Sequence, residues 1–349
     1  MAPSGNDYPR DPRFLHRLRA HPAFISIKSF SRLFSEEAMA PAVARYLRVR
    51  TELNKPATRE LNTKHQTALR YLNPYLAKGF GKIERQQILL SHYRFLEKIA
   101  SRDFHTRLLR APLTVWEVGQ GKTSCAINLS TNPRHDGELS LNFTVDGVLV
   151  YNLSFTIVLG EHVGSTYHHA LLIGRLQGRR HYDLLKVASR ACRHISPKYL
   201  LLAAVESFAL CLGIRVIAGV TTDNQVSNNH DPDFTFDYDE CWETLCGVRN
   251  EIGFYEIRLP VFKKPLEEIP SSHRRNTRLK RGFKDAVGVA VGDVVSTCVL
   301  GIGHIAFPAG VTQGGTGTGR GAESAQRPKD RSMSGQNRPI EVAAQNSIG

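Results

Sequence analysis

Hydrophobic residues recur at a helical period in the first part of the chain. Residues 84–102 place one stripe of mostly apolar side chains at 3.6-residue spacing, formed by Ile88, Leu89, His92, Phe95, Leu96 and Ile99. Residues 62–76 predict a weaker helix, which Pro74 interrupts because proline lacks a backbone donor. We therefore expect residues 1–110 to form a helical N-terminal region, with His92 as a core histidine.

The pattern changes to alternation after Pro112. Four segments rich in Val, Ile, Thr and Phe predict strands at residues 113–118, 124–129, 139–145 and 148–158. The dipeptide Asp146-Gly147 between the last two is a strong hairpin signal, because both central residues of such a turn need positive φ. Residues 170–176 predict a fifth strand.

Helices and strands then alternate. A helix is expected at residues 182–193, and a longer one follows Ser196, a good N-cap, with Pro197 at its first position and Gly213 at its end. Residues 214–220 predict a buried strand, and this β-α-β arrangement implies a parallel pair within a mixed sheet. A short helix at residues 239–245 and a strand at residues 254–259 complete the pattern.

These elements predict an α+β protein, with the helical region packed on a mixed sheet and residues 111–270 as the core domain. Residues 271–311 combine a basic segment with a Gly-rich apolar stretch. Residues 286–311 are the only membrane candidate, but their glycines, Asp293 and Pro308 disfavour a spanning helix. Residues 312–349 are rich in Gly, Ser and Gln, which predicts a disordered tail.

The charge balance adds a class of partner. Lys and Arg total 46 against 32 for Asp and Glu, a formal net charge of +14 that attracts anionic partners. A merely soluble basic protein would carry the same charge, so the total alone assigns no site. The 6 cysteines form no CxxC pair, and we expect neither a disulfide framework nor a metal site. Reduced thiols and an N-terminus without an apolar run are typical of a cytoplasmic protein.

Seven short stretches resemble the VirK/YbjX family in order and spacing over residues 65–285. They are Leu90-Ser-His-Tyr, Gly137-Glu-Leu-Ser-Leu, Ile173-Gly-Arg-Leu-Gln-Gly, His194-Ile-Ser-Pro-Lys-Tyr-Leu, Val226-Ser-Asn-Asn-His, Tyr238-Asp-Glu-Cys-Trp and Glu268-Ile-Pro-Ser-Ser-His-Arg-Arg. The resemblance implies a bacterial protein, since family members are associated with virulence and with tolerance of membrane-active peptides. The chain departs from the family after Lys284, where relatives usually end.

The first candidate site is an anion-binding turn formed by Gln177, Gly178, Arg179 and Arg180. Glycine lets backbone N–H groups approach a ligand, and arginine offers forked donors to phosphate. The layout around this turn resembles the core of GNAT acyltransferases, which grip the pyrophosphate of coenzyme A, but their Q/RxxGxG/A pattern is missing. The same residues could instead form an exposed turn with solvated arginines.

The second candidate site brings His230 together with Asp237 and Tyr238. A histidine near carboxylates can act as a general base, so these residues are our catalytic candidates. A packed corner around an acidic loop is the alternative. His168 and His169 precede a strand, where alternation predicts opposite faces and no shared metal.

The third candidate is a basic patch of Arg274, Arg275, Arg278, Lys280 and Arg281. Such a patch suits an acidic membrane surface or an acidic protein. Specific nucleic-acid binding is not expected, because only Phe283 offers an aromatic ring among these charges.

Together these features favour a cytoplasmic accessory protein of envelope stress or virulence that binds an anionic ligand or partner, with peripheral contact to the inner membrane left open. The alternative is an acyltransferase that uses acyl-coenzyme A or acyl-carrier protein, and only this alternative calls for coenzyme A. An open cleft beside residues 177–180 would favour the enzyme, whereas a filled turn would favour the binding protein.

Overall fold

The computed structural model describes residues 67–300 apart from 102–103, 105–106, 109, 122, 133 and 227–235. All of them belong to one of the chain's two units, Met1–Phe307. The expectations for residues 1–66, for His230 and for the tail at 312–349 lie outside the described residues.

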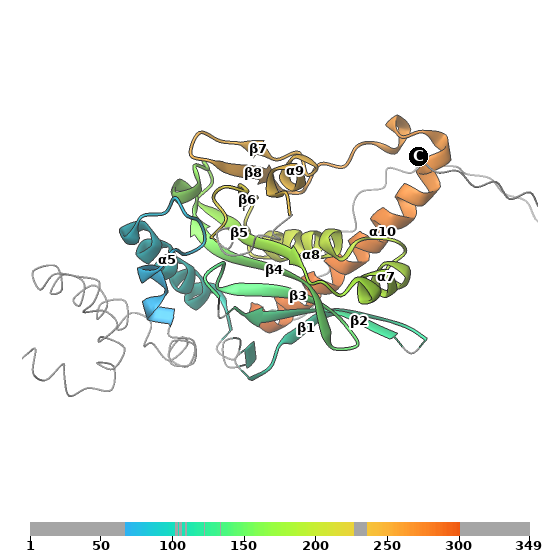
Figure 1. The fold of residues 1–349 in the computed structure, drawn as a ribbon, viewed down its shortest axis with the longest axis horizontal. Coiled ribbons are helices and arrows are strands. Elements are labelled where there is room, and N and C mark those ends of the chain that lie inside the picture. Colours follow the sequence, from blue (N-terminus) through green and yellow to red (C-terminus); the bar gives the residue numbers. More distant parts are fainter. Residues whose placement is uncertain are drawn as a thin grey trace, which may run out of the picture. The chain divides into compact units, whose positions relative to one another are not determined.

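An 8-stranded mixed sheet organises this unit (Figure 1). Its strand order is β1-β2-β3-β4-β5-β6-β8-β7, and every neighbouring pair is antiparallel except β5 and β6. The strands are β1 (Leu113–Gln120), β2 (Thr123–Thr131), β3 (Leu139–Val145), β4 (Val148–Leu159), β5 (His169–Gly178), β6 (Val216–Val220), β7 (Val248–Arg249) and β8 (Phe254–Arg258). The expected α+β class and the parallel pair are therefore confirmed.

The hairpin between β3 and β4 has the predicted turn. Asp146 and Gly147 adopt φ values of 49° and 79°, as a tight two-residue connection requires. Among the described strands, the sequence missed β7, which has two residues and is too short to show alternation.

Helices cover both faces of the central strands. The helices whose full bounds are described are η1 (Thr67–Leu72), α5 (Lys82–Ile99), η2 (Gly160–Val163), α7 (Tyr182–Ala191), α8 (Pro197–Cys211), α9 (Tyr238–Glu243), η4 (Leu266–Glu268), α10 (Ser271–Val294) and η5 (Val295–Val299). In β4, residues 153–158 are all buried, which requires cover on both faces. One face meets α5, where His92 accepts the Ile157 N–H at 3.1 Å, and the other meets α8, where Phe155 packs on Phe208.

Two local expectations about α8 had different outcomes. Pro197 occupies the first turn and Gly213 has a φ of 74° just beyond the end, as predicted. Ser196 precedes the helix, but its side chain makes no capping hydrogen bond. Ser196 is thus the N-cap residue, as expected, but the fixed φ of proline starts the helix without help from the serine side chain.

Helix α10 runs through the boundary expected between a basic segment and an apolar stretch. Its second half packs against α8, with Val287 and Val291 fully buried and the Ser207 hydroxyl donating to the Gly288 carbonyl. Its first half is largely exposed. Among the helices in the described part of the chain, none is both long and apolar enough to cross a membrane.

Candidate functional site

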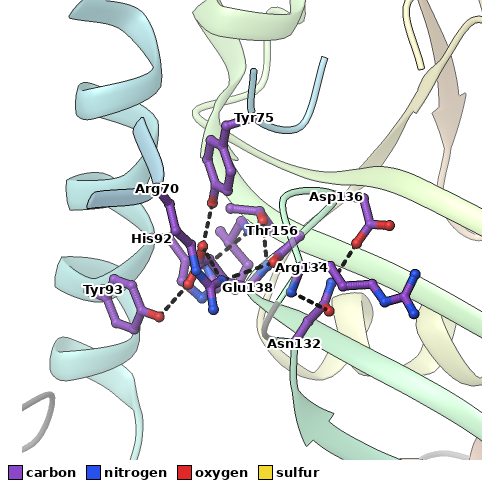
Figure 2. A network of polar contacts seen from close by, with 11 residues as sticks. Arg70, Tyr75, His92, Tyr93, Asn132, Arg134, Asp136, Glu138 and Thr156 are labelled. Carbon is purple, nitrogen blue, oxygen red and sulfur yellow. Dashed lines mark hydrogen bonds and ion pairs between the residues drawn. The ribbon is translucent and has the colours of Figure 1, made fainter. Parts of the chain in front are cut away.

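A buried carboxylate joins the N-terminal helices to the sheet. Glu138 directly precedes β3, and its Oε1 accepts hydrogen bonds from Arg70 Nη1 and Tyr75 Oη, each at 2.8 Å (Figure 2). Its Oε2 accepts a hydrogen bond from the hydroxyl of Tyr93 on α5. The Glu138 backbone N–H donates to Thr156 Oγ1 on β4 at 3.0 Å. Four segments of the chain therefore meet at this one residue.

The electrostatics of this network are those of a closed ion pair. Arg70 and Glu138 are only 4% and 2% exposed. Burial alone would lower the pKa of Arg70, but the Glu138 carboxylate raises it above its ordinary value. Burial and the same carboxylate raise the pKa of Tyr75. Because protein donors occupy both Glu138 oxygens, we assign the network a structural role.

A second carboxylate extends the network to β5. Asp136 accepts Asn132 Nδ2 at 2.7 Å and Arg175 Nη1 at 3.1 Å, so it fixes both the 132–136 turn and an arginine of β5. The turn lies directly against the strand, because a Cβ added at Gly174 would stand 2.3 Å from the Asp136 carbonyl oxygen. Gly174 is thus required by the close approach of two backbones.

Three arginines gather around Asp136, and we call Arg134, Arg175 and Arg179 the arginine cluster. Burial lowers the pKa of Arg179, and the positive charges of Arg134 and Arg175 lower it further while Asp136 opposes them. Arg134 and Arg179 are exposed, whereas the Arg175 side chain is 13% exposed. Two exposed guanidinium groups, those of Arg134 and Arg179, therefore add positive charge at the surface near the largely buried Arg175–Asp136 pair.

The predicted anion turn is partly strand. Gln177 and Gly178 are the last residues of β5 and pair with Asn152 and Tyr151 of β4. A Cβ at Gly178 would stand 2.8 Å from the Tyr151 ring, so packing accounts for this glycine. Arg179 and Arg180 form the exposed link to α7, and the Arg179 N–H donates to the Val150 carbonyl at 2.8 Å.

The catalytic candidates are placed unevenly. His230 lies outside the described residues. Asp237 accepts the Glu240 N–H at 2.9 Å and so caps α9. Tyr238 is fully buried, and its hydroxyl accepts the Leu176 N–H at 3.0 Å, while burial raises its pKa. The two described candidates thus take part in capping and packing.

The pairing of strands β5 and β6 ends before the candidate turn begins. Their parallel pairing covers Leu171 to Ile173 opposite Ile217 to Gly219. Beyond it, Gln225 Nε2 donates to the Gly174 carbonyl at 3.0 Å, and the Tyr238 hydroxyl accepts the Leu176 N–H. Side chains of the protein therefore occupy these backbone groups of β5.

The basic patch lies on the first half of α10. Arg274 donates to the carbonyls of Ile269 and Glu267 at 2.8 Å each, and Arg281 donates to the carbonyl of Lys264. These two arginines hold the segment that precedes the helix. Arg275 and Arg278 are exposed, and Lys280 is partly exposed.

The expectation that His168 and His169 point to opposite faces was wrong. Their rings stand edge to face with centroids 4.3 Å apart, because only His169 belongs to β5 and strict alternation does not extend to His168. Within the described ranges, no group of three or more His, Cys, Asp or Glu side chains could hold a metal ion.

Arg134 and Arg175 are the residues that sequence reasoning missed at the first candidate site. Arg175 belongs to the stretch Ile173-Gly-Arg, and the 132–136 turn precedes Gly137-Glu-Leu, so both lie at stretches that carry the family resemblance. No spacing in the sequence indicates that these stretches touch. The register of β4 with β3 and β5 brings them together.

Comparisons with known proteins agree with that resemblance. The family described as "Protein of unknown function (DUF535)" matches residues 25–288. "Uncharacterized protein YbjX" of Escherichia coli (strain K12) is 23% identical over 232 residues, which cover 63% of this chain and 69% of that protein. No solved structure matches, so the GNAT-like outline stays a prediction. The chain belongs to the DUF535 family, as its resemblance to the VirK/YbjX proteins predicted.

Proposed function

We propose that the chain binds a phosphorylated anionic ligand at the arginine cluster. The observation that carries this proposal is the gathering of Arg134, Arg175 and Arg179 around the single carboxylate of Asp136. The mutual repulsion of these guanidinium groups is relieved when an anion binds between them.

The chemistry of the cluster favours phosphate over a simple carboxylate. Arginine presents planar forked donors that match phosphate oxygens, and Arg175 is held in place by Asp136 at 3.1 Å. Arg180 directly follows Arg179, and α7 begins two residues later. The partial positive charge at the N-terminus of α7 therefore adds to the same region. A ligand with two linked phosphates would engage more of these donors than one phosphate can.

Calorimetry with inorganic pyrophosphate tests this proposal. The double variant Arg134→Gln with Arg179→Gln keeps side-chain length but removes two exposed charges. We expect it to bind pyrophosphate about tenfold more weakly, because charged hydrogen bonds contribute about 1.5–3 kcal/mol and solvent screens exposed ones. Arg258→Gln, an arginine whose side chain is 78% exposed on β8, is the matched control and should bind as the wild type does.

The salt dependence of pyrophosphate affinity and the comparison of the variants together test the proposal. Affinity should fall steeply between about 50 and 200 mM salt if charge dominates. Equal losses in the cluster variant and the control would mean that net charge, rather than the cluster, attracts pyrophosphate. Absence of saturable binding by the wild type would refute the proposal.

The acyltransferase alternative has less support. A coenzyme that extends along the edge of β5 would need backbone groups that Gln225 and Tyr238 already occupy. We therefore expect coenzyme A to bind no more tightly than pyrophosphate. A much higher affinity for coenzyme A or an acyl form would revive the enzyme hypothesis.

The biological setting is proposed from the resemblance alone. We infer a cytoplasmic accessory protein of envelope stress or virulence, with the basic patch as a surface for an acidic membrane or an acidic protein. The role of the basic patch is supported by the exposed first half of α10, which presents Arg275 and Arg278 to solvent.

A further inference from the structure

A cleft separate from the arginine cluster opens beside the last strands of the sheet. It has a volume of about 190 Å³ and lies among α8, α10, β6, β8 and the segment that follows β8. Leu202, Ile217 and Ile257 form an apolar wall, and each is nearly fully buried. Since a water molecule takes up about 30 Å³ of liquid, a ligand of about six heavy atoms or more fits.

Four charged side chains also line this cleft, and two of them form a closed pair. Lys263 Nζ and Asp285 Oδ1 are 2.6 Å apart, so their charges satisfy one another. The remaining two are Glu206 on α8 and Lys284 on α10.

Glu206 and Lys284 are available for a ligand. Glu206 Oε1 accepts the Val261 N–H at 2.8 Å, and this bond leaves Oε2 without a partner among the described residues. Lys284 forms no ion pair with any described side chain. Burial raises the pKa of Glu206 and lowers that of Lys284, and the attraction between these two charges opposes only part of each shift.

The charges and the wall together define the class of ligand. A carboxylate would bind Lys284 but be repelled by Glu206. An ammonium group would bind Glu206 but be repelled by Lys284. A zwitterion satisfies both charges, and an apolar body covers the wall of Leu202, Ile217 and Ile257. We propose that this cleft binds a small zwitterion with an apolar body, of the type of an aliphatic α-amino acid.

This proposal goes beyond the phosphate site and is independent of it. The two sites share no residue, since the cleft lies among α8, α10, β6 and β8 and the cluster lies at the end of β5. The double variant Arg134→Gln with Arg179→Gln should therefore leave binding in the cleft unchanged.

Calorimetry with three matched probes tests the proposal on the full chain. Leucine carries both charges, 4-methylpentanoate lacks the amine and 3-methylbutylamine lacks the carboxylate. We expect saturable binding of leucine and binding about tenfold weaker or more for each single-charge probe, because each leaves a charged group of the cleft unpaired. Equal affinity for leucine and either of the other two would overturn the zwitterion assignment.

Variants locate the binding site. Lys284→Met and Glu206→Gln should each weaken leucine binding about tenfold, and Glu206→Gln keeps an oxygen for the Val261 N–H. Ala203→Leu, on α8 at the cleft, should weaken all three probes by filling the space. Lys264→Met, a lysine outside the cleft that is 59% exposed, is the control. Leucine binding that survives both charge variants, or no leucine binding by the folded wild type, would refute the proposal.

Discussion

The Arg70–Glu138 pair gives the sharpest test of how the fold is held together. Glu138→Gln keeps the size of the side chain and removes its negative charge. The guanidinium of Arg70 would then remain 4% exposed beside a neutral amide, with the Gly137 carbonyl at 3.3 Å as a remaining acceptor. The substitution therefore isolates the cost of a buried charge.

The expected loss follows from the burial of both partners. Breaking a buried ion pair from one side costs about 3–5 kcal/mol, because the other charge stays desolvated. Tyr93→Phe removes one neutral donor from the same carboxylate and should cost about 1.5–3 kcal/mol. Since a domain is stable by about 5–15 kcal/mol, the first change should remove a large fraction of the total.

Urea unfolding at neutral pH measures these losses, with the fluorescence of Trp116 and Trp242 as the probe. Trp242 is fully buried and packs near Tyr238, so its emission should change on unfolding. A double-mutant cycle with Arg70→Met separates the pair from its surroundings. Arg70→Met in the Glu138→Gln background should cost much less than Arg70→Met alone.

Two outcomes would refute this reasoning. A loss below about 1 kcal/mol for Glu138→Gln would mean that the guanidinium finds water or another partner, as exposed pairs do. Additive losses for the two substitutions would mean that Arg70 and Glu138 do not stabilise one another.

Three further predictions concern Tyr75, Gly174 and the basic patch. Burial raises the pKa of Tyr75 above its unfolded value of about 10, so stability should be full below that pH and fall as pH rises above it. Tyr75→Phe should flatten that alkaline slope in thermal melts, and an unchanged slope would exclude this phenol. Gly174→Ala should cost about 1–3 kcal/mol by overpacking against a carbonyl oxygen; wild-type stability would mean that the turn moves away freely. Replacing Arg275, Arg278 and Lys280 by Gln should abolish salt-sensitive flotation with anionic vesicles. Undiminished flotation would show that the basic patch is not the membrane-binding surface.

The sequence predicted the local elements well, and the reason is physical. Alternation in residues 139–158 and the Asp146-Gly147 dipeptide specify a hairpin that needs no distant partner. The run from Pro197 to Gly213 likewise carries its own start and stop signals. Local signals failed where tertiary packing takes over: the two-residue strand β7 exists because β8 lies beside it.

The sequence predicted only part of the candidate site. Arg179 and Arg180 follow a buried strand, and that position already indicates a ligand site in a sheet protein. Arg134 and Arg175 were missed, because the contact between Arg175 and Asp136 spans 39 positions and depends on the register of three strands. The predicted role of Tyr238 rested on residue type, whereas burial directs its hydroxyl to a backbone N–H.

Composition and periodicity thus determined the fold class, the order of most elements and the net positive charge. Only the tertiary structure decided which charges are paired. Glu138 and Asp136 are two positions apart, and both are buried. The first is enclosed by Arg70 and two tyrosines, whereas the second pairs with Arg175 near the exposed Arg134 and Arg179. Periodicity fixes which way a side chain points along its own element, but its partners come from other elements, and the packing of those elements sets whether a charge meets a counter-charge, a backbone group or solvent.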